Sequence, residues 1–161
     1  MVELEAAIKT LTENKVDFVV IGGVAISVHS TGYVTRDLDF CYRRTTKNLK
    51  KIISAFAPFD PRLRGFPKGL PFFWDEKTLL NGTNFTLETD IGDIDLLGEV
   101  AGVGTFKEAF ENSIVVKLYD YKVHVLSLED LIKAKRAAGR TKDLLVLPEL
   151  EALQEALKET E

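Results

Sequence analysis

Cysteine and histidine are scarce in this 161-residue chain. The single cysteine, Cys41, excludes an intramolecular disulfide and any zinc site built from several cysteines. The two histidines, His29 and His124, are too few for a histidine-rich metal centre. No run approaches the ~20 consecutive apolar residues of a membrane span, and residues 1–5 are acidic and amphipathic, unlike a signal peptide. We therefore expect a soluble, cytoplasmic protein that has no membrane partner.

Positive charge is limited as well. The chain has 21 Lys and Arg against 25 Asp and Glu, which gives a net charge of -4. This balance excludes a strongly basic surface that coats nucleic acid, although a local basic cluster remains between residues 43 and 51. Hydrophobic residues make up 45% of the chain and charged residues 29%, which argues against disorder. The length fits one domain over residues 1–161.

Hydrophobic periodicity predicts an α/β (α+β) protein, in which helices pack on a mixed β-sheet. The expected strands are 16–21, 36–42, 84–88, 93–97, 113–118 and 122–126, and the expected helices are 2–14, 24–30, 46–56, 105–111 and 128–138. A last helix from Thr141 is expected to be interrupted or bent near Pro148. We expect the C-terminal helices, 127–158, to pack on the rest of the domain.

The segment 58–71 is rich in proline, glycine and arginine, which predicts an ordered loop that could cover a site. Arg62, Arg64 and Lys68, with the aromatic residues between 66 and 74, could form a surface for an acceptor or a nucleotide base. Hydrophobic packing of the aromatic residues and simple solubility of the charges explain the same pattern at least as well.

Two glycines follow the first predicted strand directly, at Ile21-Gly22-Gly23. Glycine lets the backbone approach a ligand closely, and the helix start behind it offers free N–H groups to a phosphate. A tight turn between strand and helix would need the same residues, so the motif is weak by itself.

Acidic residues alternate with apolar ones in two predicted strands. Asp37 and Asp39 point to one face of the first, and two carboxylates that close repel each other unless a cation lies between them. Hard cations such as Mg²⁺ prefer such oxygen ligands, whereas a solvated edge strand is the alternative. The second strand adds Asp95, and three convergent carboxylates suit two metal ions. Asp93 is assigned to the preceding turn.

These motifs, in this order, resemble the nucleotidyltransferase superfamily that has the DNA polymerase beta-like catalytic fold. That family places a hydrophobic residue, Gly and then Gly or Ser before a spacer, an Asp-hydrophobic-Asp/Glu pair and a later third acid. Ile21-Gly22-Gly23, Asp37-Leu38-Asp39-Phe40 and Asp95 fit this order. Further stretches resemble small single-domain proteins related to abortive-infection toxin nucleotidyltransferases: 84–87, 95–99, 126–132, Lys135 and 139–143.

The resemblance implies a minimal nucleotidyltransferase fold and a Mg²⁺-dependent enzyme. A nucleotidyl group would pass from an NTP to a hydroxyl acceptor, such as an RNA end, a protein or a small molecule. Asp37 and Asp39 would ligate Mg²⁺. Asp95 would complete a two-metal site and help deprotonate the acceptor. Gly22 and Gly23 would hold the NTP phosphates. The toxin relatives imply a toxin-type enzyme that has a cognate antitoxin as partner.

Three basic residues near the C-terminus are further candidates for nucleotide binding. Lys135 lies on the inward side of the predicted helix 128–138, where it either snorkels or reaches an anionic ligand. Arg140 and Lys142 follow Gly139 and could reach the triphosphate or the acceptor. Asp143 fits a helix-start charge as well as a partner for a cation in the site.

Two alternatives remain open. An aspartate-nucleophile phosphohydrolase also uses Asp-x-Asp, but it leaves the two glycines unexplained. A nucleotide-binding or antitoxin-paired protein without turnover is the other alternative. It is favoured by Val146, where close relatives often carry an acid. Gly23 is a further departure from the family pattern, since many relatives carry Ser there and glycine offers no hydroxyl to a phosphate.

Overall fold

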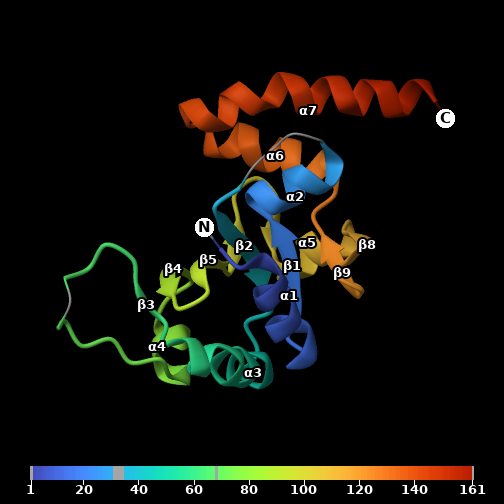
Figure 1. Cartoon of the computed structure of the whole chain (residues 1–161). Helices are drawn as coiled ribbons and strands as arrows, with labels where there is room; N and C mark the ends of the chain where they lie inside the picture. The colour runs from blue at the N-terminus through green and yellow to red at the C-terminus, as the bar shows by residue number, and fades with distance from the viewer. Residues whose placement is uncertain (1, 31–34, 68, 161) are drawn as a thin grey trace.

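The computed structural model describes residues 2–30, 35–67 and 69–160 of the chain. A mixed sheet of seven strands, in the order β3-β4-β5-β2-β1-β9-β8, forms its centre (Figure 1). These strands are β1 (Phe18–Ile21), β2 (Asp37–Tyr42), β3 (Arg62–Leu63), β4 (Asn84–Thr89), β5 (Gly92–Leu97), β8 (Ile114–Leu118) and β9 (Tyr121–Val125). A separate two-stranded ladder joins β6 (Glu99–Val100) to β7 (Gly104–Thr105). The predicted α/β fold with a mixed sheet is confirmed.

Helices flank this sheet on two sides. They are α1 (Leu4–Glu13), α2 (Gly22–His29), α3 (Thr46–Phe56), α4 (Glu76–Asn81), α5 (Phe106–Glu111), α6 (Leu128–Ala138) and α7 (Thr141–Glu159), with a short 3-10 turn at Ala57–Phe59. In Figure 1, α2, α6 and α7 lie towards the top, and α1, α3 and α4 lie towards the bottom. Within the described part of the chain, no helix has both the length and the apolar character that crossing a membrane requires.

The central strands owe their register to alternating side chains. β2 pairs antiparallel with β1 and parallel with β5. Leu38 and Phe40 of β2, like Ile94 and Leu96 of β5, are fully buried. Each such burial stabilises the fold by roughly 1.5–3 kcal/mol. A shift of one residue would turn the intervening aspartates into the core, so the apolar pattern fixes the register.

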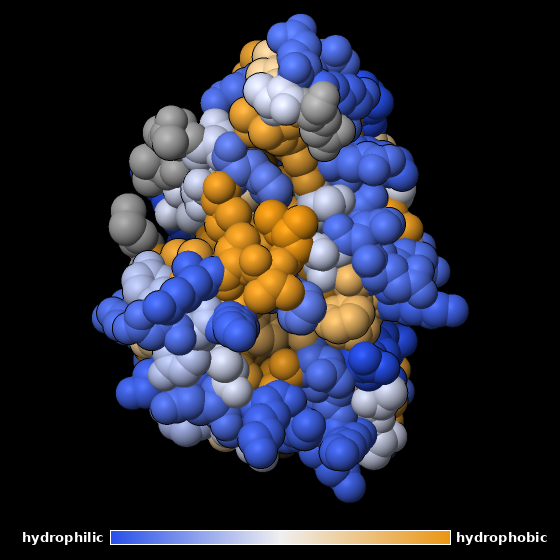
Figure 2. All heavy atoms as spheres, turned by 90° about the vertical axis from the view of Figure 1, so that its right-hand side faces the viewer, coloured by the Kyte–Doolittle hydropathy of each residue, from blue (hydrophilic) through white to orange (hydrophobic). Residues whose placement is uncertain are grey.

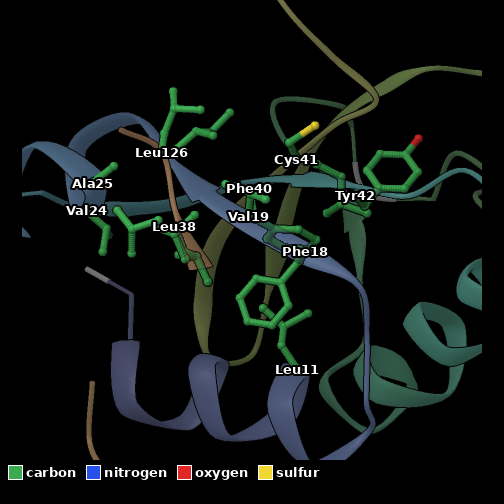
Figure 3. Packing of buried hydrophobic residues seen from close by; sticks show 14 of the residues in the cluster. Leu11, Phe18, Val19, Val24, Ala25, Leu38, Phe40, Cys41, Tyr42 and Leu126 are labelled. Atoms are coloured by element: carbon green, nitrogen blue, oxygen red, sulfur yellow. The ribbon is translucent and has the colours of Figure 1, made fainter. Parts of the chain in front are cut away.

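Aromatic rings join the helices below the sheet to its central strands. The ring centroid of Phe18 in β1 lies 5.9 Å from that of Phe40, and the ring of Phe40 lies 6.3 Å from that of Phe56 in α3. Figure 3 shows Leu11 of α1 directed towards Phe18 in the same cluster. This packing makes α1, β1, β2 and α3 one rigid support for the opposite face.

The β8 strand forms one edge of the sheet. Figure 2 views the molecule from the right-hand side of Figure 1 and shows apolar atoms gathered near the middle of that face. Ile114 and Val115 of β8 are among the exposed large apolar residues. Because β9, β1 and β2 separate β8 from β5, this edge is distinct from the place where the acidic strands meet.

The C-terminal helix differs from the sequence-based expectation. α7 includes Pro148 and continues to Glu159, so an interruption of the helix there is wrong, whereas a bend stays a prediction. Proline removes one backbone donor, and the carbonyl that would accept this hydrogen bond belongs to Leu144, an exposed residue. Leu147 and Leu150 are buried on either side of Pro148. Their packing holds the helix together across the missing hydrogen bond.

Two short elements in the segment after α3 were not predicted. α4 has six residues, too few for a clear hydrophobic period, and the Asp75 side chain caps its start by accepting from the Thr78 N–H at 2.8 Å. β3 lies within the predicted loop 58–71, where Leu63 pairs with Leu87 of β4. This pairing ties the loop to the edge of the sheet beside β4.

Candidate active site

The two acidic strands lie side by side. In the parallel register of β2 and β5, Asp37 is opposite Asp93, and Asp39 is opposite Asp95. Because side chains alternate along a strand, all four carboxylates share the face opposite to the buried Leu38. One oxygen from each of Asp37, Asp39 and Asp95 lies within 4.8 Å of the other two. The structure thus brings together the three acids singled out from the sequence, called here the acid cluster.

The turn from β1 into α2 lies against this cluster. Ile21 pairs with Asp39, and the next residue, Gly22, has φ +64°. A Cβ atom on Gly22 would lie 2.1 Å from Oδ2 of Asp39. Glycine is therefore required here both for the left-handed backbone and for the approach of the carboxylate. Gly22 lines the adjoining pocket, whereas Gly23 is not among the described residues that do so.

The acid cluster forms one wall of a pocket of about 350 Å³. Lys135, Arg140 and Lys142, the three basic candidates, line the same pocket together with Asp143. Other residues of β1, β4, β5, β6 and α6 also line it. A pocket that has acids on one side and bases on another can hold a polyanion together with its counter-cation.

The surroundings of Asp39 disfavour its ionised form. Burial, a hydrogen bond with Asp95 and the charges of Asp95 and Asp37 raise the pKa of Asp39 to about 7, against the opposing charge of Lys135. Oδ1 of Asp39 is buried and has no hydrogen-bond partner within the described residues. Because such an orphaned oxygen is costly, a bound cation would stabilise this side chain.

Asp143 holds the basic side of the pocket in place. Its carboxylate accepts from Lys135 Nζ at 2.9 Å and from Arg140 Nε at 2.7 Å, and it is fully buried. Burial opposes ionisation, but these hydrogen bonds and charges outweigh it and lower the pKa of Asp143 to about 2. It also accepts from the Arg140 backbone N–H at the start of α7. Both expected roles of Asp143, helix-start charge and partner of a cation, occur together.

Arg64 reaches the acid cluster from the loop after β3. Its Nη2 lies 2.8 Å from Oδ1 of Asp95, its Nε lies 3.3 Å from Oδ2 of Asp93, and its Nη1 lies 3.9 Å from Oδ2 of Asp37. The same Nη2 donates to the carbonyl oxygen of Leu87 at 2.8 Å. One fixed positive charge therefore lies among the acids of β2 and β5.

Sequence reasoning missed this contact because it grouped Arg64 with Arg62 and Lys68 as one loop surface. Arg62 forms ion pairs on the exposed side of the loop, and Lys68 lies outside the described residues. Asp93 was assigned to a turn, but it lies in β5. The spacing of two residues between Asp93 and Asp95 was the available signal, whereas no local pattern marks Arg64.

Nearly the whole chain matches a known protein family. The family described as "Nucleotidyltransferase of unknown function (DUF6036)" matches residues 1–153. The chain belongs to this nucleotidyltransferase family. The predicted resemblance to nucleotidyltransferases is confirmed, and the phosphohydrolase alternative loses its basis. The link to abortive-infection toxins stays a prediction. Comparison with curated proteins found no match.

Several solved structures share the fold of this nucleotidyltransferase. Lincosamide antibiotic adenylyltransferase LnuA with lincomycin bound gives a TM-score of 0.59 at 15% identity, covering 95% of this chain and 98% of that one. ANT(2'')-Ia in complex with adenylyl-2''-tobramycin gives 0.54 at 16% identity, covering 98% and 95%. An antigenic nucleotidyltransferase-like protein from Paracoccidioides brasiliensis gives 0.56 at 13% identity, covering 95% and 77%. Identities this low establish a shared fold alone.

The acid cluster fits a divalent metal ion. Carboxylate oxygens are the ligands that hard cations prefer, and three of them converge here. The orphaned Oδ1 of Asp39 is a further sign, since a cation is the simplest partner for a buried oxygen without a donor. Nucleotidyltransferases of this fold typically use an NTP and Mg²⁺, and the residues present are compatible with both.

Proposed function

We propose that this nucleotidyltransferase moves a nucleotidyl group from an NTP to a hydroxyl acceptor in a Mg²⁺-dependent reaction that releases pyrophosphate. The observation that carries the proposal is the meeting of the acid cluster with Lys135 and Arg140 in one pocket. Acids alone would suit many cation sites. Acids facing bases across a pocket, next to the start of a helix, suit a metal–triphosphate complex.

In this proposal the acid cluster holds the metal. When bound, Mg²⁺ neutralises phosphate charge and stabilises the charge that develops during transfer. Asp95 accepts the proton of the acceptor hydroxyl as that oxygen forms its bond to the α-phosphorus. The bond from phosphorus to the pyrophosphate oxygen breaks, and pyrophosphate leaves with the electron pair. Asp37 and Asp39 would hold the metal, whose positive charge would offset that of the phosphates.

Binding of the phosphates is assigned to the glycine turn and the basic wall. Gly22 and Gly23 start α2, and their backbone N–H groups are suited to donate hydrogen bonds to an anionic ligand. Arg140 keeps donors free beyond those used by Asp143, because a guanidinium has five N–H groups. Lys135 contributes charge from a fixed position, and we assign the exposed Lys142, which lines the same pocket, to the triphosphate or the acceptor.

For the acceptor, a small hydroxylated molecule is the favoured class. The net charge of -4 disfavours extended contact with an RNA end. Two proteins that share the fold are described with lincomycin bound and with an adenylylated tobramycin. A protein hydroxyl is the second choice. Transfer of label from an NTP to a protein of the cell extract would reveal it.

The test is pyrophosphate release by the purified chain with Mg²⁺, each of four labelled NTPs and a panel of acceptors. The panel holds an aminoglycoside, a lincosamide, transfer RNA and a cell extract. Asp37→Asn and Asp39→Asn should each lower release by about a hundredfold or more while the protein stays folded. Asp120→Asn is the matched control, because that side chain is 93% exposed. Full activity in both cluster variants would refute the metal-site assignment.

A nucleotide-binding protein without turnover is the second candidate. It is favoured by the contacts of Arg64, Lys135 and Arg140, which are all paired with aspartates. Saturable NTP binding without pyrophosphate release across the whole panel would support it.

The toxin role has its own test: induced expression of the active chain should arrest growth, and co-expression of an antitoxin encoded beside it should restore growth. Normal growth under induction would argue against the toxin role.

A further inference from the structure

Arg64 places a permanent cation where the proposed metal would have to bind. Its guanidinium lies 2.8 Å from Asp95 and 3.9 Å from Asp37, two of the three members of the acid cluster. It also lies 3.3 Å from Asp93, the fourth acid on this face. The guanidinium therefore takes part of the carboxylate surface that a metal ion would use.

We propose that Arg64 competes with the divalent cation for the acid cluster and so sets the metal affinity of the site. This inference rests on the proposed function, since it concerns the same carboxylates. Four aspartates on one face of a sheet repel one another, and Arg64 supplies the positive charge that offsets them when no metal is bound. A divalent cation a few ångströms from a guanidinium meets repulsion, so metal and arginine cannot both bind at full strength.

Arg64 is hydrogen-bonded to β4 and is also partly exposed to solvent. The backbone N–H of Arg64 donates to the Thr86 carbonyl at 3.0 Å, and its Nη2 donates to the Leu87 carbonyl at 2.8 Å. These contacts to β4 hold the arginine near the cluster without help from the acids. The side chain is 27% exposed, and a Cβ atom added to the next residue, Gly65, would meet nothing within 4 Å. Water can therefore solvate the guanidinium if a metal ion displaces it from the acids.

An opposite role for Arg64 makes the opposite prediction. If the arginine only positioned Asp95 for the metal, removing it would weaken metal binding. If it competes, removing it strengthens metal binding. The sign of the change in affinity thus separates competition from positioning, and it does so without any turnover.

The experiment measures Mn²⁺ binding by electron paramagnetic resonance of the free ion, with the full chain and no nucleotide. Arg64→Gln should bind Mn²⁺ about tenfold more tightly than the unmodified chain. Arg64→Lys keeps the charge but loses the planar fork, so about threefold tighter binding is expected. Arg62→Gln is the matched control, because Arg62 lies two residues before Arg64, in β3, and pairs with Asp60, Glu88 and Asp90. Its affinity should not change.

Unchanged or weaker Mn²⁺ binding in the Arg64 variants would overturn the inference. If Arg64→Gln does not fold, as judged by circular dichroism, Arg64→Lys alone decides by the same sign. The outcome is distinguishable from that of the proposed function. An unmodified chain that transfers nucleotide, with Arg64 variants that bind metal less tightly, leaves the function standing and removes the competition. If the Arg64 variants bind Mn²⁺ more tightly but the unmodified chain transfers no nucleotide, the competition stands and the proposed function is removed.

Discussion

A Cβ atom on Gly22 would lie 2.1 Å from Oδ2 of Asp39, closer than any side chain could tolerate. Gly22, the first residue of α2, can thus lie against Asp39 of β2 only because glycine has no side chain. Since β1 and β2 are paired so that Ile21 faces Asp39, the sheet itself enforces this approach. The glycine that follows β1 is therefore part of the site as well as of the turn.

The first prediction concerns Gly22→Ala. The added methyl group must displace Asp39, and φ +64° is strained for alanine, so we expect a loss of about 2–4 kcal/mol in unfolding free energy. Mn²⁺ binding should fall with it, because Asp39 leaves the cluster. Urea unfolding and metal titration measure the two effects.

Gly139→Ala is the control for that variant. Gly139 has the same φ of +64°, but the nearest atom to its added Cβ is the Arg136 carbonyl oxygen at 3.7 Å. It should cost only about 1 kcal/mol, the strain of the backbone alone. Equal losses in the two variants would mean that the contact with Asp39 has no energetic weight.

Much of the sheet could be predicted because its strands carry their own signal. β2 and β5 alternate apolar and acidic residues, and that period of two holds for any strand that has one buried face. α6 was predicted with its observed ends, since Ser127 caps it and Gly139 ends it in a left-handed conformation. Local chemistry fixes these elements.

The contacts of Arg64 could not be predicted in this way. They depend on the pairing of Leu63 with Leu87, and on a loop that carries no hydrophobic period. Local rules also fail at Pro148, where buried Leu147 and Leu150 outweigh the preference of proline to interrupt a helix. In both places packing between distant segments decides the structure, and the local patterns of a single sequence do not predict such packing.

The second prediction concerns Asp143→Asn. The change removes the carboxylate shared by Lys135, which is 16% exposed, and Arg140, which is 61% exposed and can be solvated, so about 2–3 kcal/mol of stability should be lost. Glu151→Gln is the control, because its ion pair with Arg136 is exposed on both sides and should be worth less than about 1 kcal/mol. Thermal unfolding of both variants checks the difference. Similar melting temperatures for the two would contradict the structural role of Asp143.

A third prediction concerns Asn48, which is buried at the start of α3. Its Oδ1 accepts from the Asp17 N–H at 2.7 Å, and its Nδ2 donates to the carbonyls of Asp17 and Arg43. Asn48→Ala removes the partner of the Asp17 N–H and of the Arg43 carbonyl, while the Asp17 carbonyl still accepts from the Arg43 N–H, and should cost about 2–4 kcal/mol. Asn14→Ala removes one exposed side-chain contact and should cost less than about 0.5 kcal/mol. Chemical denaturation of the pair tests this, and an equally small loss in both would be evidence against the role of Asn48.

The last prediction follows from the pKa of Asp39, which is raised to about 7 in the folded chain from 3.8. Between these two values the folded chain binds more protons than the unfolded chain, so the metal-free protein loses stability as pH rises through this window. We expect unfolding free energy in a chelator to fall by about 2–4 kcal/mol from about pH 4 to about pH 8. Asp39→Asn should lack most of this slope, and Asp120→Asn should keep it. Saturating Mg²⁺ should also flatten the slope, because a bound cation stabilises the ionised carboxylate that burial and its neighbours disfavour. An equal slope in the Asp39 variant would show that another group is responsible.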